Sequence, residues 1–315
     1  MKLRLGTRGS RLALAQSGDV ARMFEARGHE VEIQVIKTTG DRDRDRAFVE
    51  VGAPGVFVIE IEQALVAGTI DVAVHSYKDL PSKSPAELVV AAVPERVDAA
   101  DRLLIRPEAH EPGQGLIPVR RNGVIGTASA RRQALLRHFR PDLKAELLRG
   151  NLPTRVAKVR DGVFDATLLA AAGLLRLDRT AATRDPSVAL DRGGIVEVRL
   201  DPAVFVPAPS QGALAIQVRR DETPVRTEVE ALDDAAAHRA VRAERALLAL
   251  VEGGCQVPFG AWARSVDGRQ LEMIALLERE VDGAPRLART IGRGPDPEAL
   301  ARSVWEELQH GGTLL

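Results

Sequence analysis

The stretch from Phe57 to Asp79 reads FVIEIEQALVAGTIDVAVHSYKD. Its first part spaces apolar residues as on one face of a helix, and Gly68 stands where such a helix would end. The apolar run from Ile70 to His75 is typical of a buried strand. A helix followed directly by a strand belongs to a βαβ unit, so this stretch predicts an α/β fold with parallel strands.

The same alternation of strand and helix extends outward from this stretch. It predicts strands at 3–6, 31–36, 124–126, 145–148, 166–170 and 213–218, and helices at 10–26, 57–67, 233–251 and 297–309, with two more ending near 139 and 162. Residues 100–122 are interrupted by Pro and Gly and predict a crossover, residues 178–210 predict a loop that leads back, and residues 259–281 predict hairpins.

Composition excludes several classes of protein. The 315 residues contain 44 Lys+Arg and 44 Asp+Glu, which argues against a nucleic-acid binder, and one cysteine excludes an internal disulfide framework. The start of the chain, MKLRLG, lacks the apolar core of a signal peptide, and we find no apolar run of membrane-spanning length. We therefore expect a soluble cytoplasmic enzyme that binds neither membrane nor nucleic acid.

Four loops that follow predicted strands combine hydroxyl groups or glycines with cationic side chains. They read GTRGSR at 6–11, HSYKD at 75–79, GTASARR at 126–132, and RGN at 149–151 followed by Thr154 and Arg155. Helix N-termini and arginines bind anions, and such loops gather at the carboxyl ends of the strands. One loop alone would be an ordinary helix cap, but four predict a polyanionic ligand.

The chemical class of this ligand is left open by the motifs. No loop matches the phosphate-loop or dinucleotide pattern, so several carboxylates fit as well as a nucleotide does. The six histidines have no paired metal-ligand spacing, and we expect no metal site. No G-x-S-x-G motif is present to support acyl-serine chemistry.

Two reactive residues stand out. Asp79 lies among cations that favour its ionised form. It therefore suits stabilisation of a positive charge on a substrate, although a salt bridge or a turn before Pro81 is the plainer interpretation. Cys255 follows Gly253-Gly254 after a long predicted helix, where the dipole raises a thiol pKa. A thiol that reacts once and keeps its adduct suits this position better than a cycling nucleophile.

On these residues the sequence resembles the porphobilinogen deaminase (hydroxymethylbilane synthase) family, from about residue 3 to about 308. The motifs that carry the resemblance are GTRGS at 6–10, DVAVHSYKDLP at 71–81, GTASARR at 126–132, RGN at 149–151 with Thr154 and Arg155, AGL at 172–174 with Arg176, QGA at 211–213 and EGGCQVP at 252–258.

The resemblance implies three domains. Domain 1 would comprise residues 1–99 and about 211–230, domain 2 residues 100–210, and both would be α/β, like a type II periplasmic binding protein with crossing segments. Domain 3, residues 231–315, would be a small α+β domain that carries the cysteine. It also implies a monomer.

The resemblance implies an enzyme that joins four porphobilinogen molecules on a dipyrromethane cofactor held through Cys255, releasing hydroxymethylbilane and ammonia. Asp79 would be the catalytic residue. The residues implied to bind the cofactor are Ser76, Lys78, Thr127, Ser129, Arg131 and Arg132. Those implied to bind the substrate are Arg8, Ser10, Gln16, Arg149, Arg155, Arg176 and Gln211.

The sequence departs from the family pattern in several places. Pro54 and Ile59 replace two common lysines in the loop 41–59, Ser210 replaces a common Gly, and Gln217 replaces a common Glu. The arginine-rich stretch 178–206 is interpreted as a solvated surface insertion. Two rival hypotheses remain: a non-catalytic anion-binding protein of the periplasmic-receptor kind, and a diverged paralogue without turnover.

Overall fold

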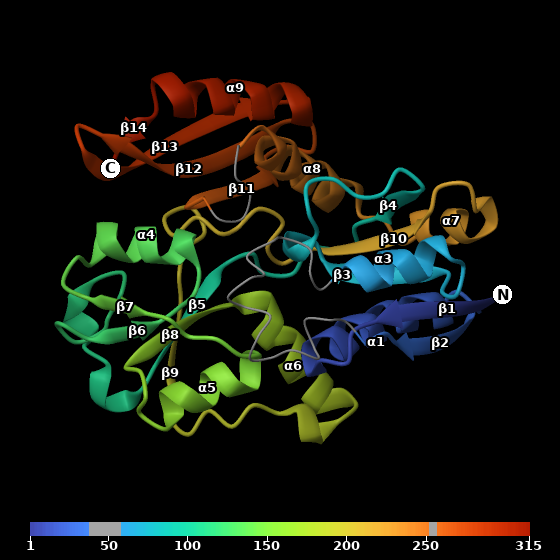
Figure 1. The fold of residues 1–315 in the computed structure, drawn as a ribbon, viewed down its shortest axis with the longest axis horizontal. Helices are drawn as coiled ribbons and strands as arrows, with labels where there is room; N and C mark the ends of the chain where they lie inside the picture. The colour runs from blue at the N-terminus through green and yellow to red at the C-terminus, as the bar shows by residue number, and fades with distance from the viewer. Residues whose placement is uncertain (38–57, 252–256) are drawn as a thin grey trace. The chain divides into compact units, whose positions relative to one another are not determined.

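The computed structural model describes residues 1–37, 58–251 and 257–315 (Figure 1). By its internal contacts the chain divides into two compact units. Unit 1 comprises Met1–Val97 and Gly212–Arg239, and unit 2 comprises Asp98–Gln211 and Ala240–Leu315. Each unit is described by itself.

Unit 1 is built on a five-stranded sheet in the order β2-β1-β3-β10-β4. β1 pairs in parallel with β2 and β3, whereas β10 is antiparallel to β3 and β4. The strands are β1 (Lys2–Thr7), β2 (Glu30–Val35), β3 (Val72–Ser76), β4 (Leu88–Ala92) and β10 (Leu214–Arg219), and the helices are α1 (Arg11–Glu25), α3 (Ile59–Val66), η1 (Tyr77–Asp79) and α7 (Thr223–Glu230).

Helices cover both faces of this sheet, which explains why the first three residues of β3, Val72 to Val74, are all apolar. Val72 and Val74 pack in the core that includes Phe24 of α1, whereas Ala73 packs in the core that includes Leu65 of α3. Successive side chains of a strand point to opposite faces, so a strand covered on both sides needs apolar residues at every position.

The first sheet of unit 2 has the same layout, in the order β7-β6-β8-β5-β9. β6 is parallel to β7 and β8, and β5 is antiparallel to β8 and β9. The strands are β5 (Asp101–Ile105), β6 (Val124–Gly126), β7 (Lys144–Glu146), β8 (Ala166–Ala170) and β9 (Val196–Arg199), and the helices are η2 (Pro107–Ala109), η3 (Pro112–Gln114), α4 (Ala130–Phe139), α5 (Leu152–Arg160), α6 (Ala171–Thr183) and η4 (Pro186–Val188).

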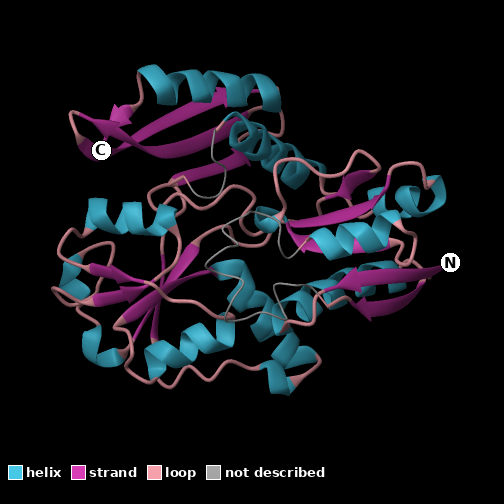
Figure 2. Ribbon diagram, in the orientation of Figure 1, coloured by secondary structure: helices cyan, strands magenta, loops and turns pink. Residues whose placement is uncertain are grey.

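The rest of unit 2 is an antiparallel sheet in the order β11-β12-β13-β14, which Figure 2 shows with its helices. Successive side chains of β12 alternate between two hydrophobic cores. Met273 and Ala275 pack with α8 and α9, whereas Ile274 and Leu276 pack in the core that includes Leu135 of α4. The elements are α8 (Ala235–Leu250), β11 (Phe259–Ser265), β12 (Leu271–Val281), β13 (Ala284–Gly294), α9 (Pro297–His310) and β14 (Thr313–Leu314).

This topology confirms the predicted fold class. In the first sheet β10 lies between β3 and the edge strand β4, and in the second sheet β5 lies between β8 and the edge strand β9. Both β10 and β5 run antiparallel to their neighbours, which is the arrangement expected of crossing segments. The C-terminal region has the predicted α+β composition. The three-domain boundaries stay a prediction.

One local prediction was wrong and another was incomplete. Residues 196–199 form β9, which pairs with β5, and Phe205 and Val206 are fully buried, so 178–206 is not a solvated insertion. Residues 101–105 form the strand β5, which the prediction of a crossover over 100–122 did not include, and the chain passes from unit 1 to unit 2 at Val97 and Asp98. Across 1–37, 58–251 and 257–315 no helix combines the length and apolarity needed to cross a membrane.

Candidate active site

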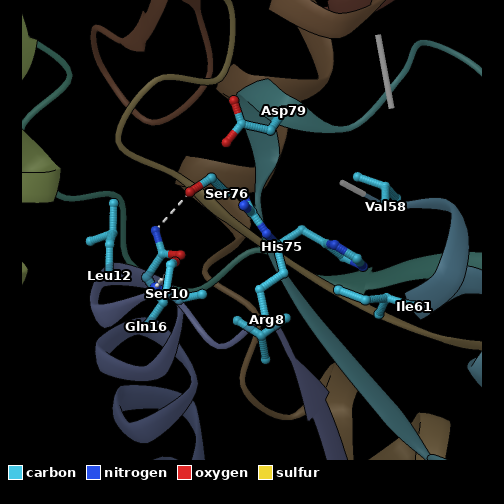
Figure 3. A pocket seen from close by; sticks show the side chains of 11 residues that line it. Arg8, Ser10, Leu12, Gln16, Val58, Ile61, His75, Ser76 and Asp79 are labelled. Carbon is cyan, nitrogen blue, oxygen red and sulfur yellow. Dashed lines mark hydrogen bonds between the residues drawn. The ribbon is translucent and has the colours of Figure 1, made fainter. Parts of the chain in front are cut away.

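A cavity in unit 1 opens at the carboxyl ends of β1 and β3 (Figure 3). These two strands are parallel neighbours, so the loops that follow them meet at one edge of the sheet, as predicted. The residues that line the cavity are Arg8, Ser10, Leu12, Ala13, Gln16, Val58, Ile61, Val74, His75, Ser76 and Asp79.

Helix α1 brings two predicted residues to the cavity. The Ser10 hydroxyl caps α1 by accepting a hydrogen bond from the Ala13 amide at 3.2 Å. Two turns of helix are enough to place Gln16 over β3, where its Nε2 donates to the Ser76 Oγ at 2.7 Å. The Gln16 side chain is buried, so this bond ties the helix to the end of the strand.

The short helix η1 places Lys78 and Asp79 directly after β3. Asp79 is exposed, and Figure 3 shows its carboxylate and the Arg8 side chain pointing toward the same space beside Ser76. A carboxylate and a guanidinium that share one cavity can bind a ligand that has both cationic and anionic groups.

His75 lies on the opposite face of β3 from Ser76 and was not predicted as a site residue. Its Nε2 is 3.2 Å from the Gln217 Oε1, and the Gln217 Nε2 donates to the Glu62 Oε1 at 2.8 Å. All three residues are buried. Burial lowers the pKa of His75 from 6.5 to about 4, so the imidazole is neutral near pH 7.

The loop 126–132 of unit 2 forms a capped helix start. Ser129 caps α4 through a bond from the Arg132 amide at 3.4 Å, and its own amide donates to the Thr127 Oγ1 at 3.2 Å. Thr127 is buried, whereas Ser129 is partly accessible. This geometry leaves the hydroxyl hydrogen of Ser129 available to an anion.

Arg131 and Arg132 share one buried partner, Asp101. The Arg131 Nη2 lies 2.9 Å from the Asp101 Oδ2, and the Arg132 Nη2 lies 2.7 Å from Oδ1. The remaining contacts include Arg131 to the Val206 carbonyl at 2.8 Å and Arg132 to the Leu168 carbonyl at 2.7 Å. The two guanidinium groups hold the pKa of Asp101 well below its usual range.

Gln211 joins the same cluster. Its Nε2 donates to the Asp101 Oδ1 at 2.9 Å and to the Ala99 carbonyl at 2.8 Å, and the residue is buried. Three residues predicted to bind ligand are thus held by one carboxylate. Asp101 itself was missed because its partners lie 30, 31 and 110 residues away along the chain.

The other predicted arginines also belong to unit 2. Arg149 is exposed before α5, Arg155 donates to the Gly150 carbonyl at 2.7 Å, and Arg176 of α6 is buried. Asn151 caps α5 by accepting from the Thr154 amide at 3.0 Å. Cys255 and residues 41–57 of the predicted loop lie outside the described residues. Within the described ranges, no cluster of three or more His, Cys, Asp or Glu could hold a metal.

Comparisons with known proteins cover nearly the whole chain. Residues 3–227 match the family model of the porphobilinogen deaminase dipyrromethane cofactor binding domain, and residues 238–310 match that of the porphobilinogen deaminase C-terminal domain. A porphobilinogen deaminase of Syntrophobacter fumaroxidans is 43% identical over 97% of this chain and 97% of its own. One of Roseiflexus sp. is 41% identical over 99% of this chain and 97% of its own.

Solved structures give more distant similarities. An ancestral cationic amino acid solute binding protein is 14% identical over 73% of this chain and 87% of its own, with a TM-score of 0.43. The periplasmic VFT2 domain of Bordetella pertussis BvgS is 13% identical over 78% of this chain and 91% of its own, with a TM-score of 0.41. By its sequence matches, the chain belongs to the porphobilinogen deaminase family.

Proposed function

We propose that this member of the porphobilinogen deaminase family joins four porphobilinogen molecules head to tail on a dipyrromethane primer and releases hydroxymethylbilane and ammonia. The observation that carries the proposal is the cavity of unit 1, where Asp79 lies beside Arg8, Ser10 and Ser76 in a chain that matches the cofactor-binding domain of this family. Porphobilinogen carries two carboxylates and an aminomethyl group, so it presents both charges that such a cavity binds.

Asp79 is proposed to act on the positive charge that develops on the substrate. Loss of ammonia from porphobilinogen leaves an azafulvenium-like cation, and an adjacent carboxylate stabilises that charge more than the charge of the bound substrate. A carboxylate at the same place accepts the proton that the attacking pyrrole carbon releases.

The residues around Asp79 are proposed to position the substrate carboxylates. Arg8 supplies a guanidinium, and Ser10 donates its hydroxyl hydrogen while its oxygen caps α1. Gln16 acts by holding Ser76 at the cavity. Arg149, Arg155 and Arg176 of unit 2 are proposed to bind further carboxylates of the growing chain.

The donor groups present fit a dipyrromethane that carries acetates and propionates. When bound, that group supplies the pyrrole carbon to which the first substrate is joined. We propose that the Cys255 thiol holds it, with Ser76, Lys78, Thr127 and Ser129 as donors to its carboxylates. Arg131 and Arg132 place two positive charges against the single negative charge of Asp101, so the buried cluster retains one net positive charge. Gln211 is proposed to act through Asp101.

We further propose that the protein acts as a monomer in the cytoplasm, with porphobilinogen as its substrate. Sedimentation of the purified protein tests the monomer, because a dimer would double the measured mass.

The direct test of Asp79 is the Asp79→Asn variant, which keeps the size of the side chain but removes its negative charge. We expect turnover of porphobilinogen to fall on the order of 10²–10³-fold, with the covalent adduct still present. Asp221→Asn, at an exposed site between β10 and α7, is the control and should keep the parent rate. An Asp79→Asn variant that turns over at the parent rate would refute this assignment.

A further inference from the structure

We propose that the neutral His75 imidazole uses its Nδ1 lone pair to accept a hydrogen bond from an N–H group of the pyrrole substrate, with Gln217 and Glu62 as positioning residues that set its tautomer. The proposal rests on the proposed function for the identity of the substrate. It adds a substrate contact on the side of β3 that faces α3.

The direction of each hydrogen bond in the buried series Glu62, Gln217 and His75 follows from chemistry. A carboxylate oxygen only accepts, so the Gln217 amide nitrogen faces the Glu62 Oε1, at 2.8 Å. The Gln217 oxygen therefore faces His75, at 3.2 Å, and an amide oxygen also only accepts. The proton of the neutral imidazole is consequently on Nε2, and Nδ1 holds a lone pair.

The surroundings keep this ring neutral. His75 is 5% exposed and Gln217 fully buried, and the atom next to the ring nitrogen is an amide oxygen rather than a carboxylate. Burial without an anionic partner disfavours the imidazolium, and the lowered pKa of His75 agrees with this geometry.

The ring lies where a substrate can reach it. His75 lines the same cavity as Arg8 and Asp79, and Figure 3 shows its ring beside Ile61. Within the described part of the chain, Nε2 is the ring nitrogen that has a hydrogen-bond partner. Nδ1 is therefore the acceptor that the ring offers to a ligand.

The cavity offers a pyrrole few side-chain acceptors besides the Asp79 carboxylate. The Arg8 guanidinium only donates, the Ser76 and Ser10 oxygens each already accept one hydrogen bond, from Gln16 and Ala13, and the Gln16 Oε1 is a further amide acceptor. A porphobilinogen molecule brings a pyrrole N–H and an aminomethyl group, which need acceptors. A neutral acceptor in the cavity that Asp79 also lines binds such a group without adding a negative charge that would repel the substrate carboxylates.

Two substitutions separate the roles of the two ring nitrogens. Glutamine reaches the position of Nε2 and can still donate to Gln217, but it lacks an acceptor at Nδ1. Asparagine places its amide group near Nδ1 and loses the contact with Gln217. We expect His75→Gln to lower kcat/KM for porphobilinogen by about tenfold or more, mainly through KM, and His75→Asn to lower it less. A purely structural His75 predicts the reverse order, which would overturn the proposal.

The tautomer is measured independently of turnover by ¹⁵N NMR of the parent protein, with the His75 ring signals assigned by through-bond correlation to the residue's own backbone amide. We expect Nδ1 to be unprotonated and Nε2 protonated at pH 7. A protonated Nδ1 would overturn the proposal even if both variants fail to fold. If the parent protein neither binds nor consumes porphobilinogen, the proposed function fails while the tautomer result stands. If the parent is active but both variants match its kcat/KM, only this inference fails.

Discussion

Asp101 shows how a single buried residue organises distant parts of unit 2. Its carboxylate is fully buried and accepts hydrogen bonds from Arg131, Arg132 and Gln211. Charge-assisted bonds of this kind offset the desolvation free energy of burying the carboxylate with its three partners. If one partner is removed, the remaining groups stay buried without that compensation, and the folded state is destabilised. The start of α4, the strand β5 and the segment that leads into β10 are thereby held at one point.

The Asp101→Asn substitution tests this cluster. It leaves two buried guanidinium groups without an anion, and we expect the free energy of unfolding at pH 7 to fall by about 3 kcal/mol. The pKa of Asp101 is lowered in the folded protein, so its contribution is present above the unfolded pKa of about 4 and declines as the pH falls below it. Denaturation by urea at pH 7 and at lower pH should therefore show a difference between parent and variant that shrinks in acid.

The matched control is Glu230→Gln, which removes the acid of an exposed pair with Arg226. We expect a loss of about 0.5 kcal/mol or less there. An equal loss in both variants would contradict the role assigned to burial.

Individual site residues were predictable where they follow a strand end. Ser76 and Asp79 reach the same cavity as Arg8 and Ser10 because parallel strands end at one edge, a rule that needs only the strand positions. The buried partners were not predictable in this way. His75 and Gln217 are 142 residues apart in the sequence, and their hydrogen bond joins β3 to β10. It depends on the register in which these two strands pair, which hydrophobic periodicity within each strand does not reveal.

At the scale of elements, the segment that leads into β10 contains a strained residue. Ser210 has a φ of 63°, in the left-handed region where a side chain is disfavoured. Its amide nevertheless donates to the buried Glu244 Oε2 at 2.5 Å, and its Oγ has no hydrogen-bond partner among the residues described. The hydrogen bond to Glu244 depends on the backbone conformation of Ser210, and the Ser210 side chain takes no part in it.

We therefore expect Ser210→Gly to raise the free energy of unfolding by about 1 kcal/mol, since glycine adopts this φ without steric cost and the buried hydroxyl is removed. Asn122→Gly is the control, because Asn122 has a φ of 58° at an exposed site and asparagine tolerates this region. Thermal unfolding of both variants measures the effect. A destabilised Ser210→Gly variant would show that the serine is required for another reason.

Elements with a clear capping residue or apolar run were predictable, including the short strands β6 and β8, whereas α6, β5 and β9 were not. Helices α1 and α9 have capping residues and a clear apolar face, and the sequence located both of them closely. Strands β5 and β9 were missed because β5 lies directly before, and β9 directly after, a stretch broken by Pro and Gly. Their strand conformation comes from pairing with each other and with β8, which is a tertiary effect.

At the scale of the whole molecule, the chain repeats one architectural scheme twice. In each five-stranded sheet four strands run in the same direction, and the fifth, β10 or β5, is antiparallel to both of its neighbours. In both, a serine caps the helix that follows a parallel strand and leaves its hydroxyl hydrogen for an anion: Ser10 after β1 and Ser129 after β6. The scheme therefore supplies a serine-capped helix start in each unit, where we propose that carboxylates of the substrate and of the growing chain bind.

We propose that the chain carries a covalent dipyrromethane on Cys255 and extends it with porphobilinogen. The most direct measurement is the intact mass of the denatured protein beside that of the Cys255→Ala variant, before and after brief exposure to porphobilinogen. We predict that the parent exceeds its polypeptide mass by two linked pyrrole units and gains further units on exposure, whereas the variant shows neither. A bare polypeptide mass that persists after incubation with substrate, or the same adduct on the variant, would contradict the claim.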